Sequence, residues 1–326
     1  MPRVILALVL TSVLTTAMTA APPAAPSRQA AKPVTLLADV RAAIAAHDLT
    51  KAEAIVVRRK AQQGATSEVI EAVSWLGRGA LGEHQLDRAE QYAVEAQRLA
   101  LAALGSKSVD TDPKLANALG AAIEVQGQVQ AERGALSDAI IFLERELKTY
   151  RTTTIAKRIQ KDINLLTLEG HPAPALELTE SMGAPLGGAT AKSLEGKVVV
   201  LFFWAHWCPD CKAEGPILAK LYAKYQSQGL AIVAPTQRFG YVAGGAPASP
   251  EDELVYMKTV QEKYYPFLAQ VPVPLSVKNH ERYGVSSTPT VVLLDRKGIV
   301  RLYHPGQLTE DELEAHLQPL LAGTGF

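Results

Sequence analysis

The pattern of apolar residues along the chain changes once, near residue 170. From Val34 to about Leu168 the apolar positions recur at helical spacing among strong helix formers, for example at Leu86, Ala89 and Ala93. Beyond a Gly- and Pro-containing stretch at residues 169–174, short apolar runs typical of strands replace this pattern. The chain is therefore predicted to hold an all-α domain over residues 34–168 and a strand-containing domain over residues 169–326.

A six-residue phrase recurs in the all-α region, at residues 47–52, 84–89 and 134–139. Each copy has a turn, a leucine, a polar residue and, two positions later, an alanine. We expect the polar residues to be helix N-caps, namely Thr50, Asp87 and Ser137. Gly77 and Gly127 precede the last two alanines by the same distance. The region resembles degenerate tetratricopeptide (TPR-like) repeats, whose helix pairs meet at such small residues; an ordinary helical bundle is the alternative.

The second region predicts a strand–helix–strand unit followed by a hairpin and a helix. Residues 198–204 and 230–234 predict buried strands, joined by a helix that runs from the cysteines to about Gln228. Residues 290–294 and 299–303 predict a hairpin, and residues 310–321 an amphipathic helix with Thr309 as N-cap. This order describes an α/β thioredoxin-like fold, a central mixed β-sheet flanked by helices, preceded by the all-α helical-repeat domain.

The two cysteines of the chain stand together as Cys208-Pro209-Asp210-Cys211, directly after the first predicted strand. The dithiol then lies at the start of a helix, where free N–H groups and the helix dipole stabilise a thiolate. Because thiolates attack disulfides, thiol–disulfide exchange is the leading hypothesis. A structural zinc site needs four ligands, and the sequence offers no second cysteine pair and no paired histidines at finger spacing. A structural disulfide across so short a loop would stabilise the fold little. We therefore expect no metal, and no cofactor other than a redox-active disulfide Cys208–Cys211.

Residues 196–216 resemble the TlpA/ResA-like thiol–disulfide oxidoreductases of bacterial envelopes, and the resemblance extends over roughly residues 172–322. It continues at Ser287-Thr288-Pro289-Thr290, where the thioredoxin superfamily carries a cis-proline facing the cysteines. The resemblance implies that Cys208 attacks and Cys211 resolves. It also implies that Trp207, Thr288 and Pro289 contact substrate, with the Thr288 backbone free to pair with a bound strand.

Glu214 follows Cys211 by three residues, on the same helical face. The resemblance implies that it assists proton transfer to or from the resolving thiol; a solvated helix glutamate is the alternative. Cytosolic thioredoxins carry a buried aspartate at the strand position that Phe202 occupies here. The chain is therefore expected to depend more on Glu214 for this proton transfer.

Pro209 and Asp210, between the cysteines, are expected to tune the redox potential. At an effective dielectric between ~20 and ~80, a carboxylate about 6 Å from the sulfur disfavours the thiolate by about 0.7 to 3 kcal/mol. A less stable thiolate means a more reducing couple. A protonated His206 close to the sulfur would offset the effect of Asp210. A histidine at such a position more often only flanks the motif on the surface.

The connection after the second strand is longer than a minimal thioredoxin fold needs. Residues 237–247 form a glycine-rich loop with two aromatic residues, and residues 251–264 predict a helix capped by Ser249-Pro250. The loop either selects substrate or covers the edge of the sheet.

The N-terminus resembles an export signal. Arg3 precedes an apolar core at residues 4–14 and small residues at 15–21, and prolines and alanines follow at 22–33. We expect a cleaved signal peptide over 1–21, a tether over 22–33 and a periplasmic or cell-envelope location; an uncleaved anchor is the alternative. The balance of 33 basic and 33 acidic residues gives no electrostatic case for nucleic acid or an anionic membrane surface.

These features favour a reductase of disulfides in client proteins (apocytochromes in the resembled family), supplied by an upstream thiol electron donor. A disulfide oxidase or isomerase is the first alternative, which Asp210 disfavours. A second alternative is an adaptor protein, whose main function is the binding of a protein partner or a second copy by the helical repeats. A peroxidase of the peroxiredoxin kind needs a threonine three residues before the reactive cysteine, where Ala205 stands.

Overall fold

The computed structural model describes residues 35–184 and 194–323, and the chain from Thr35 onward forms one compact unit. The predicted signal peptide at residues 1–21 and tether at 22–33 lie outside the described residues. Within the described ranges, no helix combines the length and apolar character needed to cross a membrane.

The first part of the described chain is all-α, as predicted, and its apolar faces form two buried clusters. Its elements are α1 (Leu36–Ala45), α2 (Leu49–Gln63), α3 (Ser67–Gly82), α4 (Leu86–Leu104), the 3₁₀ turn η1 (Val109–Thr111), α5 (Pro113–Glu132), α6 (Leu136–Tyr150) and α7 (Ala156–Thr167). The two glycines of the repeat lie where helices cross. A Cβ at Gly77 would lie 3.5 Å from backbone atoms of α4, and one at Gly127 would lie 2.9 Å from the side chain of Leu143 on α6.

The recurring phrase forms the same helix–turn–helix connection three times, at α1–α2, α3–α4 and α5–α6. In each, one residue adopts positive φ between the helices: His47, His84 and Gly134. The prediction of the N-caps is wrong by two residues. The following helices begin at the leucines, so Thr50, Asp87 and Ser137 are second helical residues and the capping positions are Asp48, Gln85 and Ala135. The tight turn explains the shift, because the residue after the positive-φ position already carries the carbonyl that starts the next helix.

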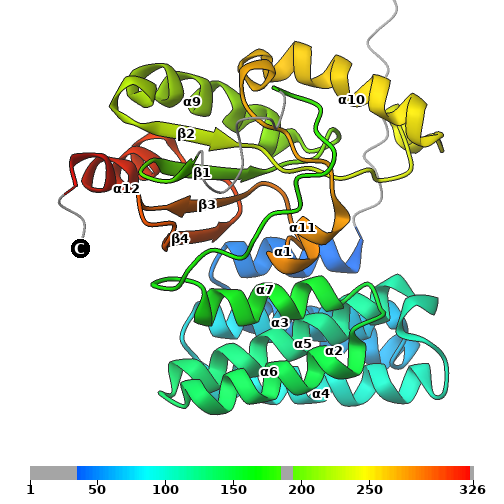
Figure 1. Ribbon diagram of the computed structural model, residues 1–326. Coiled ribbons are helices and arrows are strands. Elements are labelled where there is room, and N and C mark those ends of the chain that lie inside the picture. The colour runs from blue at the N-terminus through cyan, green and yellow to red at the C-terminus, as the bar shows by residue number, and fades with distance from the viewer. Residues whose placement is uncertain (1–34, 185–193, 324–326) are drawn as a thin grey trace, which may run out of the picture. The chain divides into compact units, whose positions relative to one another are not determined.

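The second part has the predicted thioredoxin-like fold, with sheet order β2-β1-β3-β4 (Figure 1). Its strands are β1 (Val198–Phe203), β2 (Leu230–Val233), β3 (Thr290–Leu294) and β4 (Val300–Pro305). β2 is parallel to β1, β3 is antiparallel to β1, and β4 is antiparallel to β3. The helical elements are α9 (Pro209–Tyr225), η3 (Gln226–Gln228), η4 (Ala243–Gly245), α10 (Pro250–Tyr264), η5 (Pro266–Gln270), α11 (Val277–Arg282) and α12 (Glu310–Ala322).

β1 is buried along its whole length, which explains its continuous apolar run. Because successive strand side chains point to opposite faces, Val198, Val200 and Phe202 pack in one cluster with α9 and α12. Val199, Leu201 and Phe203 face the other cluster, which contains Tyr283 at the end of α11. The predicted final helix is confirmed, and Thr309 forms a capping box with Glu312.

The chain joins the sheet as soon as the all-α part ends. The Gly170 N–H donates to the Val300 carbonyl at 2.9 Å, and the Val300 N–H donates to the His171 carbonyl at 2.9 Å. Leu168 packs with the apolar residues of β1 and β4 rather than with the helices. The two parts also touch at α7, where a Cβ at Gly284 would lie 2.3 Å from the backbone nitrogen of Lys161.

We expect each part to fold without the other, because none of the four apolar clusters contains residues from both sides of a boundary just before Leu168. A fragment of residues 34–167 should unfold cooperatively on heating, monitored by circular dichroism. A fragment of residues 168–326 should fold and reduce a small generic disulfide. Two fragments that are each unfolded would show that the parts stabilise each other, and that the predicted domain boundary is not a folding boundary.

Candidate active site

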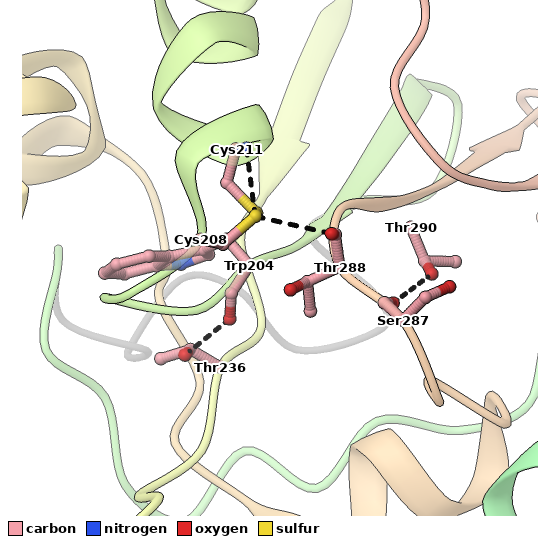
Figure 2. Close-up of a disulfide and its surroundings, with 7 residues drawn as sticks. All are labelled: Trp204, Cys208, Cys211, Thr236, Ser287, Thr288 and Thr290. Carbon is pink, nitrogen blue, oxygen red and sulfur yellow. Dashed lines mark hydrogen bonds between the residues drawn. A yellow bond between two sulfur atoms is a disulfide. The ribbon is translucent and has the colours of Figure 1, made fainter. Parts of the chain in front are cut away.

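The two cysteines lie at the first turn of α9, immediately beyond β1. They form a disulfide with Cα atoms 5.3 Å apart, and Cys208 is the N-cap residue of the helix. The Cys211 N–H donates to the Cys208 sulfur at 3.0 Å (Figure 2). In the reduced protein this N–H and the helix dipole both stabilise a thiolate at Cys208.

The loop before β3 faces the cysteines, as predicted. The Thr288–Pro289 peptide bond is cis, which confirms the prediction for Pro289. The Cys208 sulfur lies 3.3 Å from the Thr288 carbonyl oxygen, a distance at which the thiol of the reduced form can donate a hydrogen bond (Figure 2). In the described part of the chain the Thr288 N–H has no acceptor, so it is available to an extended peptide.

Exposure does not distinguish the two cysteines. Cys208 is 1% exposed and Cys211 is fully buried, so the two residues are almost equally inaccessible to solvent. Thr288, in the loop before β3, lies against the Cys208 sulfur. What distinguishes Cys208 is its hydrogen bond from the helix N-terminus. The neighbouring Trp207 is 46% exposed and presents an indole surface beside the motif.

Glu214 is completely buried, so the alternative that it is a solvated helix residue is wrong. One carboxylate oxygen accepts the Leu308 N–H at 3.2 Å, and the other has no hydrogen-bond partner. Burial raises the pKa of Glu214 to about 7; the Leu308 N–H acts in the opposite direction and the charge of Asp210 in the same direction. A carboxyl group of this pKa can take up or release a proton at neutral pH.

Asp210 and Pro209 occupy the first turn of α9 and are both exposed. The Asp210 carboxylate is near enough to Glu214 to raise its pKa, which places a negative charge close to the dithiol helix. Phe202 is buried and packs against Tyr265 with ring centroids 6.2 Å apart, so β1 supplies no carboxylate at this position.

His206 does not lie on the surface, contrary to expectation. It is 1% exposed, and its Nε2 lies 3.3 Å from a carboxylate oxygen of the equally buried Glu253 on α10. Three aromatic rings surround the imidazole, with centroids 5.3 to 5.4 Å away: those of Phe239, Tyr241 and Tyr256. Burial lowers the pKa of His206, while Glu253 opposes this shift. A neutral imidazole does not offset the charge of Asp210.

Glu253 also anchors the loop that follows β2. Its carboxylate accepts the N–H of Phe239 at 2.6 Å and that of Gly240 at 2.9 Å. Phe239 in turn packs edge-on against Trp207, with centroids 5.7 Å apart. Just past the end of β2, residues 272–274 pair with the chain: the N–H groups of Ala234 and Thr236 donate to the carbonyls of Pro272 and Pro274, each at 2.9 Å. The loop therefore borders the active-site turn. No motif in the sequence pointed to Glu253, one of three acids in the first turn of its helix.

Comparison with known proteins places this site in a family. The profile of the AhpC/TSA family matches residues 170–303. Thiol-disulfide oxidoreductase ResA of Oceanobacillus iheyensis is 31% identical over 161 residues, which cover 49% of this chain and 77% of the relative. Thioredoxin-like protein YneN of Bacillus subtilis is 30% identical over 150 residues, which cover 46% of this chain and 78% of the relative. A solved structure of a putative thiol:disulfide interchange protein DsbE from Chlorobium tepidum is 27% identical, covers 47% of this chain and 97% of its own, and has a TM-score of 0.36.

A dithiol at the N-terminus of a helix, opposite a cis-proline on a sheet of order β2-β1-β3-β4, defines a member of the thioredoxin superfamily. Within it, the chain belongs to the TlpA/ResA-like family of thiol–disulfide oxidoreductases. It is a thiol–disulfide oxidoreductase, and proteins that carry disulfide bonds are its class of substrate.

We expect Glu214→Gln to remove a pH dependence of stability. In the folded chain Glu214 stays protonated from its ordinary pKa of 4.5 up to about 7, whereas the unfolded chain loses this proton. The free energy of unfolding of the native chain should therefore fall as pH rises through this window and level off above it. Exchange activity near pH 7 should drop by about 100-fold in the variant, because general acid–base catalysis is lost.

Urea unfolding between pH 4.5 and 8.5 measures the slope, and Glu262→Gln, an exposed glutamate of α10, is the control that should keep it. Asp162, whose pKa burial also raises to about 7, contributes equally to every variant, so the difference isolates Glu214. Equal slopes in the native chain and Glu214→Gln would contradict the assignment.

Proposed function

We propose that this chain is an exported reductase of disulfides in client proteins, acting through the Cys208–Cys211 dithiol. The Cys211 N–H directed at the Cys208 sulfur supports the attacking role of Cys208, because it stabilises a thiolate at one defined position. The observation that carries the reductase direction is the carboxylate of Asp210 between the cysteines, because it disfavours the thiolate. The steps need no cofactor beyond this disulfide and no metal.

The reaction proceeds in two exchanges. The Cys208 thiolate attacks one sulfur of the client disulfide, forms a mixed disulfide and releases the other client sulfur as a thiolate. Cys211 then loses its proton and attacks Cys208, which frees the second client sulfur and leaves Cys208–Cys211 oxidised. The client gains two electrons from the dithiol, and its two released thiolates take up protons from the surrounding water. Glu214, the buried carboxyl group of raised pKa, accepts the Cys211 proton in its ionised form in this scheme.

The direction of the reaction follows from charge. Strong oxidants owe their potential to a highly stabilised thiolate, and this motif carries the negative charge of Asp210 on the same helical turn. His206 supports the same direction, because its buried imidazole provides no positive charge near the sulfur. An upstream thiol donor must then return the disulfide to the dithiol. An oxidase or isomerase is the alternative that a high potential would favour.

Export is proposed on the N-terminal pattern of residues 1–21, and the periplasm or cell envelope is the compartment that it implies. Apocytochromes, and hence cytochrome c maturation, are the candidates that the family resemblance offers. The TPR-like helices α1 to α6 are proposed to bind a protein partner or a second copy rather than to take part in bond exchange.

We expect Cys208→Ser to abolish reduction of protein disulfides, because the variant lacks the attacking thiolate. Cys211→Ser should instead accumulate mixed disulfides with clients, because the second exchange cannot occur. Non-reducing gel electrophoresis after acid quenching measures both. Equal trapping by the two variants, or turnover without Cys208, would contradict the order of attack.

We expect the reduction potential of the couple to lie nearer about −270 mV than about −120 mV, with Asp210→Asn shifting it upward. Removing the carboxylate makes the thiolate, and with it the reduced form, more stable. Equilibration with glutathione or dithiothreitol buffers gives the potential. A native value above about −180 mV would favour the oxidase alternative, and no response to Asp210→Asn would contradict the electrostatic explanation.

A further inference from the structure

A groove of about 310 Å³ lies beside the dithiol. One side is formed by residues already placed at the site, namely Trp207, Phe239 and the Ser286–Thr288 loop with its unpaired backbone N–H. The opposite side comes from the all-α part, through Thr154 before α7 and Lys157 in the first turn of α7. The helical half therefore lines the groove beside the dithiol.

Lys157 is the only charged side chain among the described residues that line this groove. It is half-buried, and burial lowers its pKa while the charge of Glu281 opposes the shift. In the described part of the chain no carboxylate lies within ion-pair distance of it. Lys161, one turn further along α7, shows the contrast, because it pairs with Asp162 at 2.9 Å and Glu124 at 3.3 Å.

A partly desolvated cation without an ion-pair partner costs free energy that a structural role would not require. The neighbouring groove residue His280 does not add a second charge, because burial lowers its pKa to about 3 and leaves it neutral. Asp210 is not among the lining residues, so the groove carries a single positive charge.

We propose that the groove binds the client segment beside its reactive cysteine, and that Lys157 selects a segment with an acidic side chain. The inference rests on the proposed reductase function and names its substrate class: disulfides flanked by aspartate or glutamate. The client backbone pairs with Thr288, the indole of Trp207 covers its apolar side, and its carboxylate completes the ion pair that Lys157 lacks. Lys157 is a specificity-determining residue and takes no part in bond exchange.

The test uses the full chain and three probes. Two synthetic peptides each carry one intramolecular disulfide and differ only beside the cysteine, with glutamates in one and glutamines in the other. The third probe, 2-hydroxyethyl disulfide, is small and neutral. The variants are Lys157→Gln and Lys157→Glu, with Lys148→Gln as the matched control: Lys148 is an exposed lysine of α6 outside the groove.

We expect the native chain and Lys148→Gln to reduce the glutamate peptide with a kcat/KM about tenfold above that of the glutamine peptide, mainly through KM. This preference should weaken as salt is added. It should vanish in Lys157→Gln and reverse in Lys157→Glu. Reduction of 2-hydroxyethyl disulfide and the reduction potential should stay unchanged in both.

A preference that survives in Lys157→Glu overturns the inference, as does a Lys157→Gln variant that loses activity equally on all three probes. If the native chain reduces both peptides equally well, the groove inference fails while the reductase function stands. If it reduces neither peptide nor 2-hydroxyethyl disulfide, the reductase function itself fails.

Discussion

The antiparallel register of β1 and β3 pairs Phe203 with Thr290, and the active site depends on this one pairing. Cys208 follows Phe203 by five residues and Thr288 precedes Thr290 by two, so the register sets the Cys208 sulfur 3.3 Å from the Thr288 carbonyl oxygen. A slip of one residue would turn every side chain of β1 to the opposite face. The slip would also separate the dithiol from the cis-proline loop. Because both strands are buried along their whole length, such a slip would also disrupt the packing of the apolar clusters on the two faces of the sheet.

Two buried glutamates close to the motif show how hydrogen bonding assigns different tasks to the same side chain. The carboxylate of Glu253 has two backbone N–H donors and His206 around it, and it ties the loop after β2 to the active-site turn. Glu214 has one donor and one unpartnered oxygen, so burial dominates and its pKa rises to about 7. The hydrogen bonds of Glu253 hold the loop after β2 in place beside the active-site turn. The arrangement around Glu214 leaves a carboxyl group that exchanges protons in the range where thiols react.

The all-α half contributes a surface to the site while keeping a core of its own. Its apolar clusters end at Ile163 and Leu166, and Leu168 already belongs to the sheet. Yet α7 approaches the thioredoxin-like part closely enough that a side chain at Gly284 would clash with the backbone of Lys161. Because the two halves have separate cores, the dithiol, Glu214 and the cis-proline loop can all lie in the thioredoxin-like half. The contact at α7 brings Lys157 to the groove beside the dithiol, where we propose that it selects the client.

The sequence by itself determined the elements and the dithiol, because these depend on local signals. The apolar run before Cys208, the turn phrases of the helical part and the Thr309 cap each act over a few residues. It also indicated the cis-proline, through the resemblance at Thr288-Pro289. It misplaced His206, and it left open both the state of Glu214 and the task of the loop after β2. Those outcomes were decided by segments tens of residues away: α10 supplies Glu253 to His206 and to the loop after β2, and Leu308 donates its N–H to the buried Glu214. Lys157 of α7, which has no ion-pair partner among the described residues, likewise reaches the groove only through packing. Burial and unpaired charge arise only when such distant segments pack together, so only the tertiary structure decided them.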